Sequence, residues 1–150
     1  MIQAIKDAIN ENPSHVRLWL VFGNVCIKKG DYDVVIQAWL TAIEKNSKVE
    51  IYSRLCCLLG RTYHYKHDFN AAIEWYRIAI ASDPDDEDPW SLLTRSYQEI
   101  NNHEGVVEVL IHVINADHGK PRYEWHDLGK TYKTLRKYRE TSEAYEIGIK

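Results

Sequence analysis

The stretch WHDLGKTYKTLRKY, residues 125–138, carries the pattern that decides the fold. Its Trp125, Leu128, Gly129 and Tyr132 stand at positions i, i+3, i+4 and i+7. That spacing places all four on one stripe of an α-helix, because the helix turns once every 3.6 residues. A glycine inside a helix costs about 1 kcal/mol relative to alanine. Its place on the apolar stripe therefore indicates that a neighbouring helix packs closely there.

The same pattern occurs four times along the chain. The earlier copies are WLVFGNVCIKKGDY at residues 19–32, CCLLGRTYHYKHDF at 56–69 and WSLLTRSYQEINNH at 90–103. Their starts are separated by 37, 34 and 35 residues. Each copy continues into a second apolar pattern, such as AAIEWYRIAI at residues 71–80. The sequence therefore predicts a repeated pair of helices, with a turn in which Asp31 and Asp68 are placed to cap the second helix.

This unit resembles the tetratricopeptide repeat (TPR), a helix-turn-helix of about 34 residues. Besides the four residues of the last copy, the residues that match the family pattern are Gly60, Tyr63, Phe69, Ala72, Tyr76, Ala79 and Pro84. The departures are Cys56 at the first aromatic position, and Thr94 and His103 in the third copy, which we expect to pack more loosely. The resemblance implies an all-α fold, an α-solenoid of stacked repeats wound as a right-handed superhelix.

The expected organisation is a single TPR domain over residues 1–150. Residues 1–12 form the second helix of a preceding repeat, and the four repeats occupy 16–47, 53–86, 87–120 and a truncated 122–150. Since terminal repeats normally carry a polar outer face and this chain shows none, we expect a segment of a longer array. Its free end is expected to expose parts of Leu128, Tyr132, Tyr145 and Ile149 and to permit self-association.

Composition excludes several classes of protein. The net charge of −3 gives no overall basic field for nucleic acid. The chain has no apolar run near the roughly 20 residues of a membrane span, and no signal peptide, so no membrane contact is expected. Three cysteines, an odd number, argue against a disulfide framework and favour a reducing, intracellular location, expected to be the cytoplasm.

No pattern for catalysis or metal binding stands out. His64 and His67 lack a third ligand at metal-binding spacing. Cys56 occupies the phase of a buried aromatic residue, which favours packing. The acidic stretch DPDDEDP, residues 83–89, lacks the central glycine of a calcium loop and is interpreted as a turn before the next helix. We expect no enzymatic activity, no cofactor and no bound metal.

The resemblance implies a ligand-binding groove lined by the first helix of each repeat. Transferred to this chain, the family's ligand-facing positions give the candidate groove residues Arg17, Asn24, Lys28, Arg54, Arg61, His64, Tyr65, Arg95, Tyr123, His126, Lys130 and Lys133. The same positions also include Leu20, Ile27, Cys57, Asp88, Ser91, Gln98, Glu99 and Thr134. Together the twenty carry seven Lys or Arg and two Asp or Glu, although the whole chain is acidic.

A basic groove on an acidic body favours an acidic ligand, because a concave surface of one charge concentrates the opposite charge. We therefore expect a non-enzymatic scaffold that binds a protein or peptide partner, an acidic one. Alternatively, the charges are solvated or pair with neighbouring acids such as Glu50 or Asp127. Two other functions stay open: a ligand-sensing or regulatory region of a larger signalling protein or enzyme, and RNA binding, against which the acidic body counts.

Some family members hold a chaperone's C-terminal carboxylate with a clamp of Lys, Asn and Arg side chains. The corresponding positions here are Leu20, Asn24, Leu58, Asp88 and Leu92. Only Asn24 fits the pattern, so this clamp is not expected.

Overall fold

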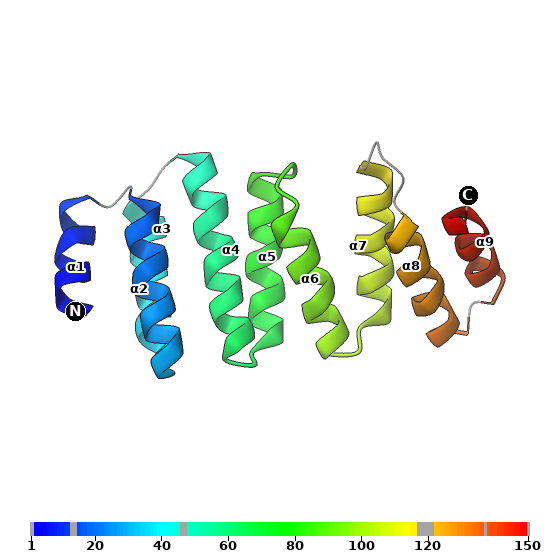
Figure 1. The fold of residues 1–150 in the computed structure, drawn as a ribbon, viewed down its shortest axis with the longest axis horizontal. Helices are drawn as coiled ribbons and strands as arrows, with labels where there is room; N and C mark the ends of the chain where they lie inside the picture. The colour runs from blue at the N-terminus through cyan, green and yellow to red at the C-terminus, as the bar shows by residue number, and fades with distance from the viewer. Residues whose placement is uncertain (1, 13–14, 46–47, 117–121, 137, 150) are drawn as a thin grey trace. The chain divides into compact units, whose positions relative to one another are not determined.

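The computed structural model describes residues 2–12, 15–45, 48–116, 122–136 and 138–149. Over these residues the structure has nine α-helices and no strand (Figure 1). In chain order they are α1 (Ile2–Glu11), α2 (Val16–Lys29), α3 (Tyr32–Lys45), α4 (Val49–Tyr65), α5 (Phe69–Ser82), α6 (Asp88–Glu99), α7 (His103–Ala116), α8 (Arg122–Thr134) and α9 (Tyr138–Ile149). The predicted all-α repeat of paired helices is confirmed. The fourth helix begins at Val49, earlier than the repeat start predicted at residue 53.

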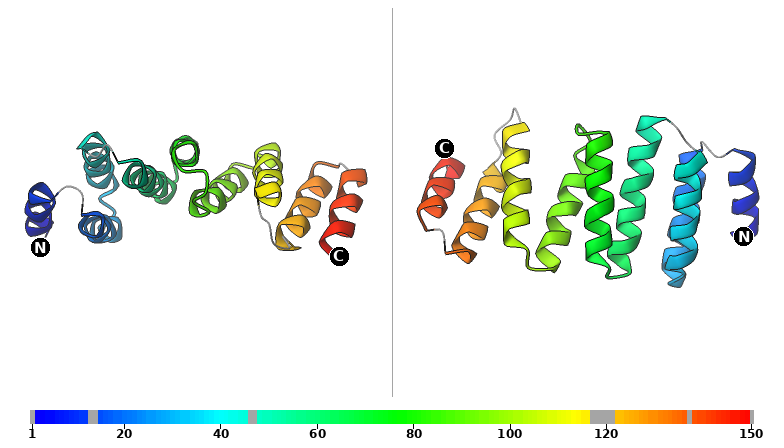
Figure 2. Two further views of the ribbon diagram at one scale, coloured as in Figure 1. Left: turned by 90° about the horizontal axis from the view of Figure 1, so that it is seen from above. Right: turned by 180° about the vertical axis from the view of Figure 1, so that it is seen from behind.

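The chain divides into two compact units, Met1–Leu92 (unit 1) and Leu93–Lys150 (unit 2). In unit 1, α2 contacts α3 and α4, α3 contacts α4, and α4 forms a hairpin with α5 (Figure 1, Figure 2). In unit 2, α8 contacts α7 and forms a hairpin with α9. The right-handed superhelix and the single repeat domain stay predictions.

The core of unit 1 forms where the apolar stripes of successive helices meet. Trp19 and Phe22 of α2 are 4% and 1% exposed, and Trp39 and Ala42 of α3 are 1% and 0% exposed. The buried Trp39 indole N–H donates to the Thr62 hydroxyl oxygen of α4 at 3.1 Å. This hydrogen bond ties the second helix of one repeat to the first helix of the next.

Aromatic rings of the second helices pack against the glycines on the first helices, as the position of the glycines on the apolar stripe predicts. A Cβ atom on Gly60 would lie 2.7 Å from the Tyr76 ring, and one on Gly129 would lie 2.6 Å from the Tyr145 ring. A Cβ on Gly23 would overlap the ring of Trp39 in the same way. Each glycine therefore allows the second helix of its repeat to bring an aromatic side chain against the first helix.

The third repeat keeps this contact with the roles of its two helices exchanged. Thr94 stands where the other repeats have glycine, and Leu110 stands where they have the aromatic ring. Here Gly105 lies on the second helix, and its Cβ would come 2.7 Å from the ring of Tyr97 on the first helix. The repeat therefore retains a close glycine–aromatic contact, and the looser packing expected from Thr94 stays a prediction.

The turns within the four repeats share one backbone feature. A residue with left-handed φ stands eleven positions after the start of each copy: Gly30 (φ 79°), His67 (63°), Asn101 (55°) and Arg136 (59°). Within the described residues, a side-chain cap is present at the start of the next helix in two repeats. The Asp68 carboxylate accepts from the Ala71 N–H at 3.1 Å, as predicted, and the Asn102 side-chain oxygen accepts from the Gly105 N–H at 2.9 Å. The conformation of the turn is thus determined by residues within it, through the left-handed backbone and the side-chain caps.

The expected exposure of Leu128 is wrong. This side chain is 2% exposed because α8 is packed against both α7 and α9. Tyr132 and Tyr145 are half-buried, and the side chain of Ile149 lies outside the described residues. Among the described side chains of α9, Ile147 is a large apolar one that is exposed, at 45%. Self-association stays a prediction.

Candidate functional site

The candidate groove residues are mostly exposed on the first helices of the repeats. In unit 1 the exposed ones are Arg17, Asn24 and Lys28 on α2 and Arg54, Arg61 and Tyr65 on α4. In unit 2 they are Arg95, His126, Lys130 and Lys133. The Tyr123 side chain lies outside the described residues.

The two candidate histidines each contact an aromatic ring of the second helix in their own repeat. His64 is half-buried, with its ring centroid 5.0 Å from that of Phe69 in an edge-on arrangement. His126 lies 5.4 Å from Tyr145, centroid to centroid. Part of each imidazole is therefore used in packing, which leaves the arginines as the more available groups.

Unit 1 contains a pocket of about 600 Å³ where α2, α4 and the start of α6 come together. The groove positions among its lining residues are Leu20, Arg54, Cys57, Arg61, Asp88 and Ser91. Leu58, Asp83, Asp86 and Leu92 complete the lining. The structure therefore brings together predicted positions from three repeats that are far apart in the sequence.

The pocket carries charges of both signs. Arg54 and Arg61 are exposed, and over the described residues no carboxylate oxygen lies within 4.0 Å of either guanidinium. The acidic members are Asp83, Asp86 and Asp88. The Asp86 carboxylate accepts from the Asp88 backbone N–H at 3.1 Å, which fixes the turn before α6.

Sequence reasoning missed Asp83 and Asp86 as pocket residues. They belong to the connection between α5 and α6, whereas the groove positions were assigned on the first helices alone. The acidic run at residues 83–89 was the available signal. This acidic run leads directly into α6, and the first turn of α6 contains Asp88, one of the assigned groove positions.

Leucine side chains form the apolar part of the pocket. Leu20, Leu58 and Leu92 are half-buried and come from α2, α4 and α6. These are three of the positions compared above with the polar carboxylate clamp. The surface can therefore receive an apolar side chain and place charged groups beside it.

Cys57 in the pocket wall is not an activated nucleophile. Burial, together with Asp86, raises the pKa of its thiol to about 12, against a smaller lowering by Arg61. Burial also raises the pKa of Cys56 to about 11. Because the thiolate is the reactive form of cysteine, both groups are protonated and unreactive near neutral pH.

The described part of the chain contains no group of three or more His, Cys, Asp or Glu side chains arranged to hold a metal ion. Within the same residues, every helix is too short or too polar to cross a bilayer.

Residues 53–86 match the family model described as tetratricopeptide repeat. The chain therefore contains a tetratricopeptide repeat over these residues. The matched range is the one assigned above to the second repeat, which contains Gly60 against Tyr76 and the capping Asp68. No curated protein matches the chain in sequence.

Solved structures share the helical-repeat fold at low identity. A crystal structure of MamA is 18% identical with a TM-score of 0.74, over 99% of this chain and 84% of that one. A Podosopora anserina putative kinesin light chain with nearly identical TPR-like repeats is 18% identical, with a TM-score of 0.65, over 93% and 75% of the two chains. A tetratricopeptide repeat protein from Parabacteroides merdae is 14% identical, with a TM-score of 0.70, over 97% and 52%. The fold is an all-α helical-repeat solenoid, and such repeats generally mediate protein–protein interaction.

Proposed function

We propose that this TPR protein is a non-enzymatic scaffold that binds an acidic segment of a partner protein in the groove of its first helices. The observation that carries the proposal is the unit 1 pocket, in which Arg54 and Arg61 flank an apolar surface without a carboxylate partner within 4.0 Å among the described residues. An arginine can hold a carboxylate through two parallel hydrogen bonds. The segment would place an apolar side chain over the leucines and a carboxylate on the arginines.

The three aspartates refine the class of partner. Since like charges repel, the Asp83–Asp88 wall disfavours a ligand that is uniformly anionic. The pocket favours a segment whose apolar side chain is flanked by an acidic residue and by a polar or basic residue. The acidic residue would face the arginines, and the polar or basic residue would face the aspartates. The repeating phosphates of RNA do not, which makes RNA the weaker candidate.

The exposed cations of unit 2 provide further contacts for a partner. Arg95, Lys130 and Lys133 present ammonium or guanidinium groups from α6 and α8. The His126 imidazole would add an aromatic contact, and Tyr65 would do so in unit 1. We place this interaction in the cytoplasm, where the three thiols would stay reduced.

The test is a pull-down from lysate with bound material identified as protein or RNA. One bait is the wild-type chain, and the other carries Arg54→Glu and Arg61→Glu. We expect protein partners to be lost from the double variant. Peptides made from the binding segments of these partners should bind the wild-type chain at least tenfold more tightly than the double variant. In the variant, two charge-assisted hydrogen-bonded contacts become repulsive.

The matched control carries Lys45→Glu and Arg77→Glu, which make the same change of charge at exposed positions on α3 and α5, outside the pocket. Circular dichroism checks that all three baits are folded. Equal partner lists from the three baits would contradict the groove proposal. Recovery of RNA that depends on Arg54 and Arg61 would favour the nucleic-acid alternative. Capture of a signalling protein or enzyme of which this chain is a region would favour the alternative of a regulatory function.

A further inference from the structure

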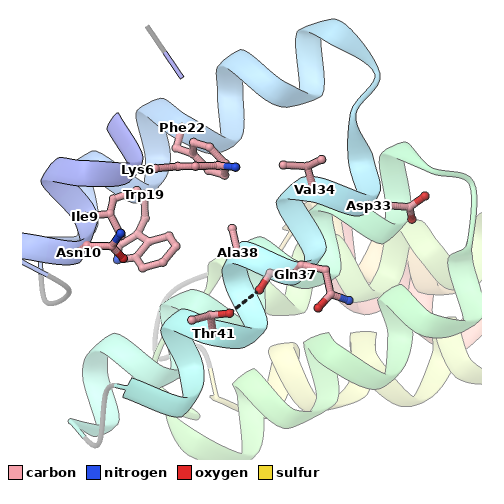
Figure 3. Close-up of a pocket in the computed structure, with 10 residues that line it drawn as sticks. All are labelled: Lys6, Ile9, Asn10, Trp19, Phe22, Asp33, Val34, Gln37, Ala38 and Thr41. Carbon is pink, nitrogen blue, oxygen red and sulfur yellow. Dashed lines mark hydrogen bonds between the residues drawn. The ribbon is translucent and has the colours of Figure 1, made fainter. Parts of the chain in front are cut away.

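A second cavity lies in unit 1 between α1, α2 and α3 (Figure 3). Its volume is about 500 Å³. Pockets of roughly 300–1,000 Å³ are the size that binds small organic molecules. None of its lining residues belongs to the candidate groove set or to the arginine-lined pocket. The proposed groove function therefore leaves this cavity without a role.

The floor of the cavity is apolar and aromatic. Figure 3 shows side chains from the three helices around one space: Ile9 of α1, Trp19 and Phe22 of α2, and Val34 and Ala38 of α3. Trp19 and Phe22 are almost fully buried, whereas Val34 is 43% exposed. The cavity thus leads from an exposed branched side chain down to two aromatic rings.

The aromatic floor is held in place by the packing beneath it. The Trp19 and Trp39 ring centroids are 5.7 Å apart and tilted by 46°. Trp39 in turn is seated against Gly23 and donates its indole N–H to Thr62. A surface of this kind is preformed, so a ligand would not have to order it on binding.

Among the described residues, two charged side chains line the cavity, Lys6 and Asp33. Asp33 already forms an ion pair with Lys66, with 2.8 Å between its carboxylate oxygen and the Lys66 Nζ. The Lys6 Nζ lies 5.9 Å from the centroid of the Phe22 ring. Over the described residues no carboxylate oxygen lies within 4.0 Å of Lys6. The cavity therefore combines an apolar floor with one ammonium that lacks a carboxylate partner there.

Neutral polar groups complete the rim. Asn10 and Gln37 contribute side-chain amides, and the Thr41 hydroxyl donates to the Gln37 backbone carbonyl at 2.9 Å. The amides can donate hydrogen bonds to an oxygen at the mouth, while the Thr41 proton is already used. These groups can hold a carboxylate oxygen, but since a side-chain amide can also accept, the preference for an acid comes from Lys6.

We propose that this cavity binds a small amphipathic organic acid with an aromatic or short aliphatic body and one carboxylate. The body lies against Val34 and Ala38, over the nearly covered rings of Trp19 and Phe22, and the carboxylate lies beside Lys6. Charge complementarity with Lys6 selects the acid, and the apolar floor selects its body. A small polyanion is disfavoured, because it would bury charge against the rings without further cations to pair with.

The test uses hydrocinnamate and its neutral amide as a matched pair of probes, titrated into the ¹⁵N-labelled protein and followed by amide chemical shifts. For the acid we expect saturable shifts confined to α1, α2 and α3, with a Kd on the order of 1 mM. The exposed substitution Lys6→Gln should weaken binding of the acid about fivefold, and it should leave binding of the amide unchanged.

Two further variants sharpen the result. Val34→Asp places a carboxylate at the exposed mouth and should weaken the acid more than the amide. The Arg54→Glu, Arg61→Glu double variant changes the groove alone and should leave both probes unaffected, so this proposal can fail or hold independently of the groove function. Equal effects of Lys6→Gln on acid and amide, shifts centred outside the three helices, or no saturation up to about 20 mM would overturn the proposal.

Discussion

A single glycine in each repeat controls how closely its two helices pack. Gly60→Ala gains about 1 kcal/mol of helix propensity. The added Cβ would, however, lie 2.7 Å from the Tyr76 ring, which is buried and cannot move aside freely. Overpacking of a filled core costs about 1–3 kcal/mol, so we expect a net loss of stability. Urea unfolding followed by circular dichroism measures it.

Gly30→Ala is the matched control for that substitution. Gly30 has a φ of 79° and no neighbouring atom within 4 Å of the position its Cβ would take. We expect Gly30→Ala to lose about 1 kcal/mol of stability, and this loss would come from the left-handed backbone conformation alone. Unchanged or higher stability of Gly60→Ala would show that the Tyr76 contact does not limit the packing.

The buried thiol of Cys57 makes stability depend on alkaline pH. A cysteine in the unfolded chain has a pKa of about 8.5, and in the folded chain burial raises the pKa of Cys57 to about 12. The fold therefore favours the protonated thiol. Its contribution to stability is complete below the unfolded pKa and is lost as pH rises toward the folded one.

We expect the free energy of unfolding to fall between about pH 8.5 and pH 10, with a slope of up to about 1.4 kcal/mol per pH unit for each such thiol. Cys57→Val should make this slope shallower, whatever it does to stability at neutral pH. Chemical unfolding across the pH range measures both slopes. Parallel slopes for the two proteins would contradict the assigned role of Cys57.

At the scale of the elements, the turn inside each repeat requires one left-handed residue. Arg136 and Asn101 occupy this position in two repeats, with φ of 59° and 55°. Asparagine adopts this backbone more readily than residues with longer side chains, and glycine adopts it without strain. We expect Arg136→Gly to stabilise the protein by up to about 1 kcal/mol, and Asn101→Gly to have a smaller effect. Thermal unfolding of the two variants measures the difference, and an equal or reversed order would contradict this account of the turn.

The helices themselves were predictable because the spacing of apolar residues in each repeat is visible within a short stretch of sequence. The stripe of Trp125, Leu128, Gly129 and Tyr132 needs no knowledge of distant residues, and it recurs at nearly constant spacing. The exchange of roles in the third repeat was not predictable in this way. Thr94 and Leu110 look like separate departures until the structure shows Gly105 and Tyr97 making the equivalent contact.

At the scale of the whole molecule, the charge of −3 and the mixed charges of the unit 1 pocket predict weak affinity for RNA. We expect no detectable binding of fluorescent poly(U) at about 150 mM salt, where the Debye length is about 8 Å. Fluorescence anisotropy measures this binding. A log affinity that falls linearly with log salt concentration, and that is lost in the Arg54→Glu, Arg61→Glu variant, would reverse the choice of ligand class.

The candidate groove was predictable on one side only. The family pattern placed Arg54 and Arg61 on a first helix, and both side chains are exposed as that placement requires. The opposite wall was not predicted, because Asp83 and Asp86 reach the pocket through the connection to the next repeat. A charge count along helix positions cannot include residues that only the packing of successive repeats brings near.

The order of the residues was sufficient to predict the repeated helical pairs, their apolar stripes and the exposed cations, because these depend on a period of 3.6 residues and on contacts between neighbours in the chain. The tertiary structure was needed for the burial of Leu128, the acidic wall of the groove and the cavity beneath Lys6. These features depend on how far apart the helices lie. That separation is set by the combined volumes of side chains from several helices, and it cannot be obtained from the pattern of any one of them.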